Sequence, residues 1–154
     1  MDAAISTSNR FRTARERAGL SIAETAERTG ISEPCVHDLE THDEEVMSVY
    51  SPADLQQFAS VFSIAPRELL GTEERGVPIS AAELASAIRE HCRVRSMTLD
   101  DFGKAAGWDA IKALESPELL LTNVSLDGIR DICRELGIDW QRFISGLSTT
   151  TNAR

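Results

Sequence analysis

The chain of 154 residues contains few aromatic residues, few cysteines and no long apolar run. Aromatic residues make up only 5% of it, so a hydrophobic core must be built mainly from Leu, Ile, Val and Ala. No apolar stretch approaches the roughly 18–20 residues that a membrane-spanning helix needs, and the first residues do not resemble a secretory signal. Since 42% of the residues are hydrophobic, we expect a packed globular protein in the cytoplasm.

The three cysteines, Cys35, Cys92 and Cys133, are scattered and form no C-x-x-C pair. Each falls within a helical pattern where a small apolar side chain would fit, and an odd, scattered set does not make a disulfide framework. Cys35, His37 and His42 come nearest to a metal site. However, residues 35 and 37 lie on different faces of a helix, and no fourth ligand follows at a suitable spacing. We expect reduced thiols and no metal or other cofactor.

Motifs typical of enzymes are missing as well. The sequence has no Gly-rich phosphate-binding loop, no H-E-x-x-H and no G-x-S-x-G. Its many carboxylates fall on short amphipathic helices, where a solvated surface is the simpler interpretation. We therefore expect a protein without enzymatic activity.

Positive charge is scarce and unevenly distributed. The net charge is −9; residues 1–71 carry six Lys and Arg against twelve Asp and Glu (−6), and residues 72–154 carry ten against thirteen (−3). Lys and Arg supply most of the non-specific affinity for DNA because they neutralise phosphates. This balance is unfavourable for a nucleic-acid partner unless a local basic patch exists.

Helix starts and stops are abundant. Ser21 with Glu24 has the form of a capping box, and Ser51 with Asp54 adds a proline at the first helical position. Two further starts begin at Ser80 and Thr98, and glycines that can close a last turn stand at Gly30, Gly71, Gly107 and Gly137. No segment alternates like a strand. These signals predict helices at 8–18, 22–29, 33–40, 52–62, 66–70, 81–93, 99–106, 109–115, 126–136 and 140–146.

The apolar pattern indicates an internal repeat. The stretch from Ser51 to Leu69 matches the stretch from Ser125 to Phe143 at a constant offset of 74 residues, and upstream matches such as Gly30 with Gly107 have an offset of 77. We expect one domain at 1–71, a linker at 72–79, a second domain at 80–147 and a flexible tail at 148–154, because the junction is polar and interrupted by Gly and Pro.

Residues between 10 and 70 match a known pattern. The matching residues are Arg15-Glu16, Leu20-Ser21, Ala26, Gly30-Ile31-Ser32, Val36, Leu39-Glu40, Ile64 and Leu69-Leu70. With them, this segment resembles the Xre (Cro/phage-repressor) family of helix-turn-helix proteins. The second half matches more weakly, through Thr98, Gly107, Leu114-Glu115 and the stretch from Ser125 to Ile144. The resemblance implies an all-α fold of two tandem five-helix, lambda-repressor-like helix-turn-helix domains, the second one degenerate.

In that family the third helix lies in the major groove and reads base edges near its N-terminus. The resemblance thus implies a double-stranded DNA operator, often bound by a homodimer, and these reading positions: Ser32, Glu33, Pro34, His37 and Asp38. None of Arg, Lys, Asn or Gln, the usual base-reading residues, occurs between residues 32 and 41. An acidic run at 42–45 follows, and Ile22 stands where family members often carry Gln.

The second half offers further candidates at Lys104, Trp108 and Lys112. Arg93 and Arg95 beside Lys104 would form a phosphate-contacting edge, or else they are ordinary solvated charges. Trp108 replaces an apolar turn residue, and it either packs in the core or anchors a partner protein, as does Trp140 near Phe143.

Two functions remain open from the sequence. The first is a DNA-binding transcriptional regulator of Xre type, including an antitoxin that regulates its own operon. The second is an acidic module of the same fold that binds a basic protein such as a toxin, as an antitoxin or immunity protein, and does not itself bind DNA. The first rests on the family resemblance, and the second on charge, because complementary potentials steer association.

Overall fold

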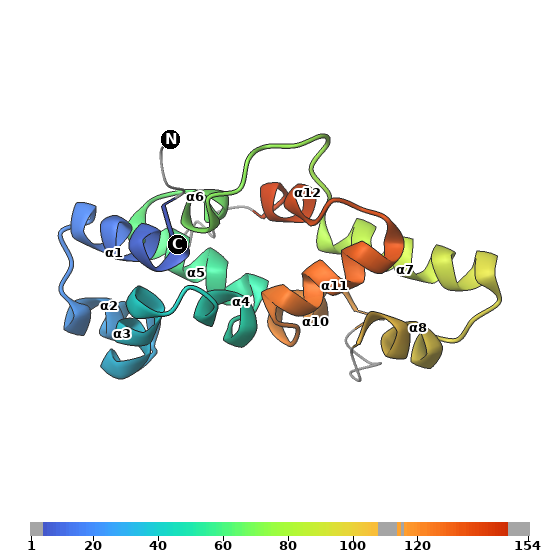
Figure 1. Ribbon diagram of the computed structural model, residues 1–154, viewed down its shortest axis with the longest axis horizontal. Coiled ribbons are helices and arrows are strands. Elements are labelled where there is room, and N and C mark those ends of the chain that lie inside the picture. The colour runs from blue at the N-terminus through green and yellow to red at the C-terminus, as the bar shows by residue number, and fades with distance from the viewer. Residues whose placement is uncertain (1–4, 108–113, 115, 148–154) are drawn as a thin grey trace.

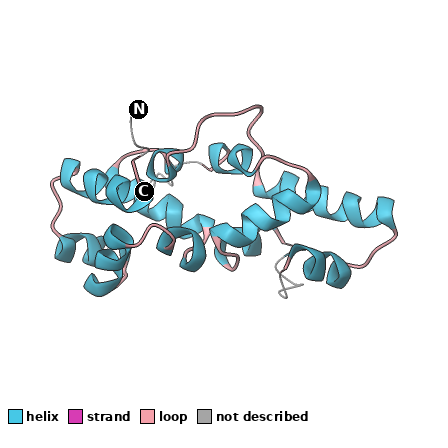
Figure 2. Cartoon of the chain, viewed as in Figure 1, coloured by secondary structure: helices cyan, strands magenta, loops and turns pink. Residues whose placement is uncertain are grey.

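The computed structural model describes residues 5–107, 114 and 116–147, and in these residues it contains helices and no strands (Figures 1 and 2). The first half of the chain forms α1 (Thr7–Arg17), α2 (Ile22–Thr29), α3 (Glu33–Thr41), α4 (Glu45–Val49), α5 (Pro52–Phe62) and α6 (Pro66–Leu70). The second half contributes α7 (Ala81–Arg95), α8 (Leu99–Ala106), α10 (Pro117–Thr122), α11 (Leu126–Leu136) and α12 (Trp140–Ser145). The all-α fold class is confirmed.

Nine of the predicted helices agree with the observed ones to within two residues at either end. The tenth, at 109–115, lies outside the described residues apart from Leu114, which is buried. The sequence did not predict α4 and α10. Both are short, with 5 and 6 residues. No side chain caps the N-terminus of α4, whereas α10 begins with Ser116-Pro117, a start pattern like that of Ser51-Pro52, although the Ser116 side chain forms no cap.

Side-chain caps fix where the longer helices begin. Capping boxes form at all four predicted starts, namely Ser21, Ser51, Ser80 and Thr98. Gly30 and Gly107 end α2 and α8 with φ angles of 76° and 77°, a left-handed conformation that glycine adopts without strain. The chain therefore turns in the same way after the second helix of each half.

Buried positions recur at the two offsets seen in the sequence. The buried residues of α2 and of α8 are 77 residues apart: Thr25, Ala26 and Thr29 correspond to Phe102, Gly103 and Ala106. Those of α5 and α11 are 74 apart: Leu55, Phe58 and Ala59 correspond to Ile129, Ile132 and Cys133. The counterpart of α3 lies outside the described residues, so the tandem repeat stays a prediction.

The two halves pack against each other in a reciprocal way. At an offset of 74, α4, α5 and α6 correspond to α10, α11 and α12, and the contacts between halves join α4 to α11, α5 to α10 and α6 to α12. This exchange of corresponding surfaces is the pattern of a two-fold interface. In Figure 1, α4 and α5 face α10 and α11 in the middle, with α1 and α7 on opposite sides. The backbone N–H of Leu126 donates to the Tyr50 carbonyl at 2.9 Å.

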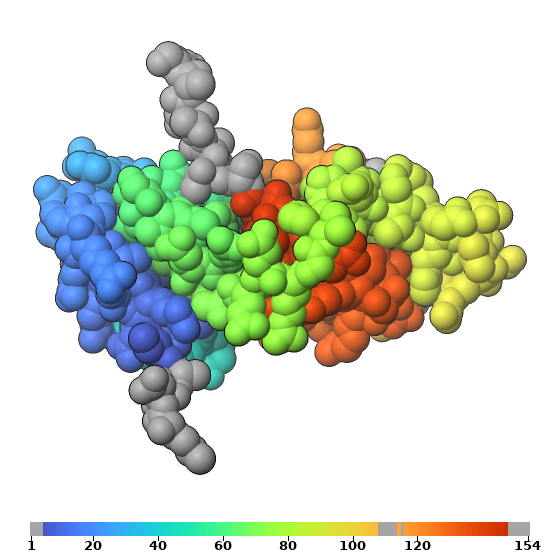
Figure 3. Space-filling model, turned by 90° about the horizontal axis from the view of Figure 1, so that it is seen from above, coloured from blue at the N-terminus to red at the C-terminus, as the bar shows by residue number. Residues whose placement is uncertain are grey.

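One hydrophobic cluster runs through both halves, from Phe11 to Leu147. The boundaries predicted for separate domains therefore stay a prediction, since the halves share a core. The segment from 72 to 80 has no regular structure and crosses the surface between them (Figures 1 and 3). Its end is attached to α12: Ile79 N–H donates to the Arg142 carbonyl at 3.0 Å, and Arg142 Nε donates to the Val77 carbonyl at 2.7 Å.

Candidate nucleic-acid interface

The turn between α2 and α3 determines how α3 is presented. After Gly30, Ser32 caps α3 by accepting a hydrogen bond from the Cys35 backbone N–H at 3.4 Å, and Pro34 lies in the first turn of the helix. Val36 and Leu39 are buried and hold α3 against its neighbours. The helix packs on α1, α2 and α4, all in the first half.

The outer face of α3 carries the five positions expected to read DNA. Ser32, Glu33, Pro34 and His37 are exposed and Asp38 is half-buried. Figure 1 places α2 and α3 at the end of the molecule away from α7, α8 and α11. The structure therefore brings these five residues together on one accessible surface, which we call the α3 face.

Glu40, at the end of α3, points inward. Its residue is only 5% exposed, and its carboxylate accepts two hydrogen bonds from Arg15, from Nε and, at 3.1 Å, from Nη2. Arg12 lies 3.7 Å from the same carboxylate and donates to the Glu40 carbonyl at 3.0 Å. The bond to Glu40 raises the pKa of Arg15 above its ordinary value, with burial opposing it. This charge network connects α1 to α3, as expected for a satisfied buried ion pair.

Asp43 is exposed and also serves the fold. Its Oδ1 accepts hydrogen bonds from the Ser8 hydroxyl at 2.6 Å and the Ser8 N–H at 3.0 Å. These bonds, the one from the hydroxyl first, hold the pKa of Asp43 below its ordinary value. The acidic cluster expected beside α3 is thus smaller by one carboxylate than the sequence suggests, because Glu40 is buried and paired with arginines, whereas Asp43 keeps its exposed negative charge. Glu44 remains exposed and Glu45 half-buried.

Comparison with known proteins agrees with this geometry. Residues 8–70 match the family described as the helix-turn-helix domain. The first half of this chain is a helix-turn-helix domain. The match confirms the family resemblance there, and it assigns this half a fold used by DNA-binding regulators rather than by a family of enzymes. It does not extend to residues 80–146. No curated protein and no solved structure matches the chain significantly.

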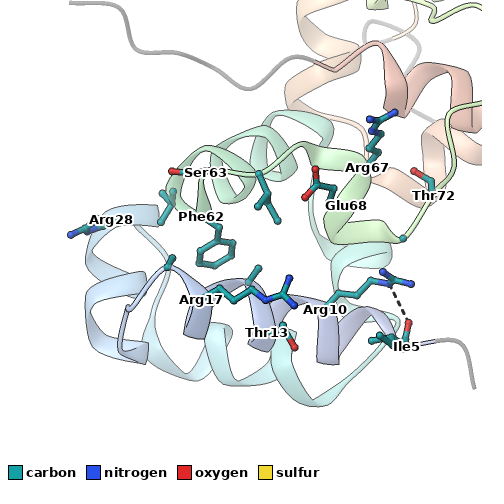
Figure 4. A pocket seen from close by; sticks show the side chains of 15 residues that line it. Ile5, Arg10, Thr13, Arg17, Arg28, Phe62, Ser63, Arg67, Glu68 and Thr72 are labelled. Atoms are coloured by element: carbon teal, nitrogen blue, oxygen red, sulfur yellow. Dashed lines mark hydrogen bonds between the residues drawn. The ribbon is translucent and has the colours of Figure 1, made fainter. Parts of the chain in front are cut away.

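All six basic residues of the helix-turn-helix half lie outside α3. Arg12 and Arg15 bind Glu40, as described above. The other four line a cavity between α1, the end of α2, α5 and α6: Arg10, Arg17, Arg28 and Arg67 (Figure 4). The α3 face therefore combines a helix-turn-helix geometry with neutral and acidic side chains.

Candidates in the second half are paired locally. Lys104 Nζ lies 2.7 Å from Asp100, and Arg93 lies 2.6 Å from Glu90, with all four side chains at least half exposed. Such pairs contribute little and fit solvated helix faces. Trp108 and Lys112 lie outside the described residues, and Trp140, at the start of α12, packs against the core.

Sequence reasoning missed both arginine clusters. A signal for the cavity was present, because Arg10 and Arg17 are seven residues apart and so share one face of α1. No comparable signal joined Arg15 to Glu40, which is 25 residues away. Among the described residues, no group of His, Cys, Asp and Glu could hold a metal ion, and no helix is long and apolar enough to cross a membrane.

Proposed function

We propose that this protein is a DNA-binding transcriptional regulator of the Xre type, which reads duplex DNA with the first turns of α3. The observation that carries the proposal is the accessibility of the α3 face within a helix-turn-helix domain. A reading helix has to protrude into the major groove with its N-terminal side chains toward the bases. Ser32, Glu33, Pro34 and His37 occupy that position and are exposed.

The chemistry of the α3 face indicates what kind of site it would read. Glu33 and Asp38 can accept a hydrogen bond from the amino group of cytosine, and Ser32 and His37 can bond to several base edges. With no Lys or Arg on α3, phosphates would be contacted mainly by polar side chains and backbone N–H groups, which position a protein without releasing many counterions. We therefore expect binding that depends on salt less steeply than is usual.

The reciprocal packing of the halves supports an operator bound by a single chain, whereas other regulators bind their operators as two copies. The surfaces of α4, α5 and α6 that would join a second copy are used within the chain by α11, α10 and α12. We propose that a monomer binds an operator with two unequal half-sites, the second contacted from the side of Lys104, Trp108 and Lys112. An antitoxin that represses its own operon is one regulator of this kind.

A second candidate is favoured by charge. Since the basic residues of the first half all lie elsewhere, Glu33, Asp38 and Glu44 give this end of the molecule a negative surface. Such a surface suits a basic protein partner, for example a toxin, and in that case the protein would act without DNA.

The test is selection of bound duplexes from a random-sequence pool. The most enriched duplex is then titrated with the protein at several salt concentrations. The informative variant is Glu33→Lys with Asp38→Lys, and the matched control is Glu73→Lys with Glu118→Lys, which adds the same charge at exposed positions outside α3. We expect the α3 variant to raise non-specific affinity at low salt by about tenfold or more over the control.

The outcomes separate the two candidates. An enriched sequence and a larger effect of the α3 variant support DNA reading. Equal effects of the two variants, with no enriched sequence, would show that α3 does not approach the duplex. A basic protein that is recovered from the host, and is lost when Glu33 and Asp38 are changed to Lys, would establish the second candidate instead.

A further inference from the structure

The cavity lined by four arginines is unlike the rest of this acidic molecule. It has a volume of about 690 Å³ and lies between α1, α5 and α6, with Arg28 of α2 at one end (Figure 4). Four arginines and one acidic residue, Glu68, line it, which gives a local charge of +3 in a chain of net charge −9. No residue of α3 contributes to it, so it is separate from the α3 face.

The arginines surround an apolar middle. Figure 4 shows the Phe62 ring between Arg28 on one side and Arg10 on the other, with Arg17 below it in this view. Ala14, Ala18, Val61 and Ile64 complete the apolar lining. Small-molecule sites typically have this build and a volume of roughly 300–1,000 Å³, with a few polar groups converging on an apolar cavity.

Several polar groups at the cavity are available to a ligand. Within the described residues, Arg17 and Arg28 are exposed with no carboxylate at salt-bridge distance, although Glu24, one turn before Arg28, interacts with it electrostatically. Thr72 Oγ1 is buried without a hydrogen-bond partner. Arg67 pairs with Glu74 of the linker at 2.8 Å, a pair that a stronger anion can displace because Glu74 is 64% exposed.

Arg10 is held at the opposite end of the cavity from Arg28. Its Nε donates to the Ile5 carbonyl at 3.2 Å, and its guanidinium lies so close to Gly71 that a Cβ there would collide with it. The absence of a side chain at Gly71 thus allows Arg10 to lie flat at the mouth of the cavity.

From this arrangement we infer that the cavity binds a small organic phosphate, with the phosphate among the arginines and an apolar or planar body along Phe62, Val61 and Ile64. A phosphate monoester carries a charge of about −1.5 to −2 at neutral pH, which fits the +3 lining better than a single carboxylate does. Arginine forks bind phosphate oxygens in pairs. A duplex is the poorer fit, because its phosphates could contact the exposed arginines at the rim but would leave the apolar surface of Phe62, Val61 and Ile64 unused.

The inference is tested by calorimetric titration of the full chain with three probes at equal ionic strength: adenosine monophosphate, adenosine and inorganic phosphate. We expect adenosine monophosphate to bind, and each of the other two to bind at least about tenfold more weakly. Arg17→Gln with Arg28→Gln, both at exposed positions, should weaken the nucleotide about tenfold or more. Glu74→Gln should strengthen it about two- to threefold by releasing Arg67.

The control is Arg93→Gln, which removes an exposed arginine of α7 outside the cavity and should leave nucleotide binding unchanged. The inference fails if adenosine monophosphate does not bind, if the double arginine variant binds it like the parent, or if inorganic phosphate binds equally well. Competition by a short DNA duplex that depends on Arg17 and Arg28 would also overturn it, since the arginines would then belong to a DNA-binding surface. Because the titrations contain no DNA in the first instance, their failure leaves the proposal for α3 untouched.

Discussion

Helices α4 to α6 of the first half pack reciprocally with α10 to α12 of the second, yet the two halves fix their first helices, α1 and α7, by different chemistry. In the first half Arg15 of α1 binds Glu40 and donates from Nη1 to the Leu20 carbonyl at 2.8 Å. The residue 77 positions later is Cys92 of α7, which is buried and whose Sγ lies 3.9 Å from the Thr98 carbonyl. At this offset, a half-buried cation in α1 corresponds to a small buried side chain in α7.

The difference bears on how firmly α3 is oriented. Arg12 and Arg15 bond to Glu40 in fixed directions, so they determine both the distance and the rotation of α3 relative to α1. A packed thiol such as Cys92 contributes contact area without direction. Burial also raises the pKa of the Cys92 thiol, which keeps it uncharged. We interpret the ion-pair network as the device that orients the α3 face.

The largest expected effect comes from breaking this network. Glu40→Ala leaves Arg15, whose side chain is 12% exposed, without its buried partner, so the free energy of unfolding should fall by about 3 kcal/mol. Cys92→Ala in the second half removes packing and one long S–H hydrogen bond to the Thr98 carbonyl, and it should cost about 1 kcal/mol. Urea unfolding followed by circular dichroism measures both. Equal losses would mean that the two halves are held in the same way after all.

A second comparison concerns the glycines that follow α6 and α12. Gly71 has a φ of 65°, and a Cβ there meets only the movable end of Arg10. Gly146 has an ordinary φ of −80°, but a Cβ there would collide with the backbone carbonyl of Ile79. The first glycine is needed for its conformation, and the second for close contact with the linker.

Alanine substitutions at these glycines should therefore differ. Gly146→Ala has to push the linker away from α12 and should lower the free energy of unfolding by about 2 kcal/mol. Gly71→Ala should cost about 1 kcal/mol, the usual penalty for a left-handed non-glycine residue. Thermal unfolding of both variants gives the comparison. A milder effect at Gly146 than at Gly71 would show that the linker adjusts without strain.

Local features of this fold were predictable from the sequence, because they depend on residues three or four apart. The capping box of Ser21 with Glu24 and the left-handed turn at Gly30 gave the limits of α2 correctly. The positions on the α3 face followed from the helix-turn-helix resemblance. In contrast, α4 was missed because no capping residue precedes it, and α10 was missed although Ser116-Pro117 repeats the start pattern of Ser51-Pro52.

Features that depend on tertiary contacts were not predictable. The inward direction of the Glu40 side chain depends on where α1 lies. In the sequence, Glu40 is not distinguishable from the other acidic residues near the end of α3. The cavity needs α1 and α6 side by side before Arg10 and Arg67 can share it. Likewise, the matches at an offset of 74 suggested two similar halves without saying that α5 would pack on α10.

The third prediction concerns acid sensitivity, which should be greater where a carboxylate holds separate helices together. Asp43 joins α1 to the segment after α3, and its pKa is lowered from 3.8 by Ser8. A depressed carboxyl pKa stabilises the folded state above pH 3.8, and the stabilisation is lost as the pH falls through the lower, folded value. In the second half Glu83 has a lowered pKa, chiefly through the Ser80 N–H and hydroxyl of its own capping box, with a smaller contribution from Arg142 of α12.

Asp43→Asn should thus have a lower free energy of unfolding than the parent at pH 7. This difference in stability should vanish as the pH is lowered below the folded pKa of Asp43. Glu83→Gln should differ less from the parent in its free energy of unfolding, since it affects the start of one helix. Urea midpoints measured from pH 7 down to pH 2.5 test this. If the difference in stability between Asp43→Asn and the parent stays constant over the whole pH range, the ionised carboxylate of Asp43 does not stabilise the fold.

The smallest effect concerns a reaction rate rather than stability. The thiol of the first half should react with a disulfide reagent faster than the two thiols of the second half. Cys35 beside the α3 face is half-buried, whereas Cys92 and Cys133 are buried, and burial raises the pKa of Cys133 to about 12. Only thiolates attack disulfides, so a reagent such as dithiodipyridine should modify one thiol quickly in the native protein and all three after unfolding in urea. Cys35→Ser should abolish the fast phase. If Cys133 reacted as fast as Cys35, the core between the halves would have to open on the same timescale, and the second half would be far less firmly packed than the first.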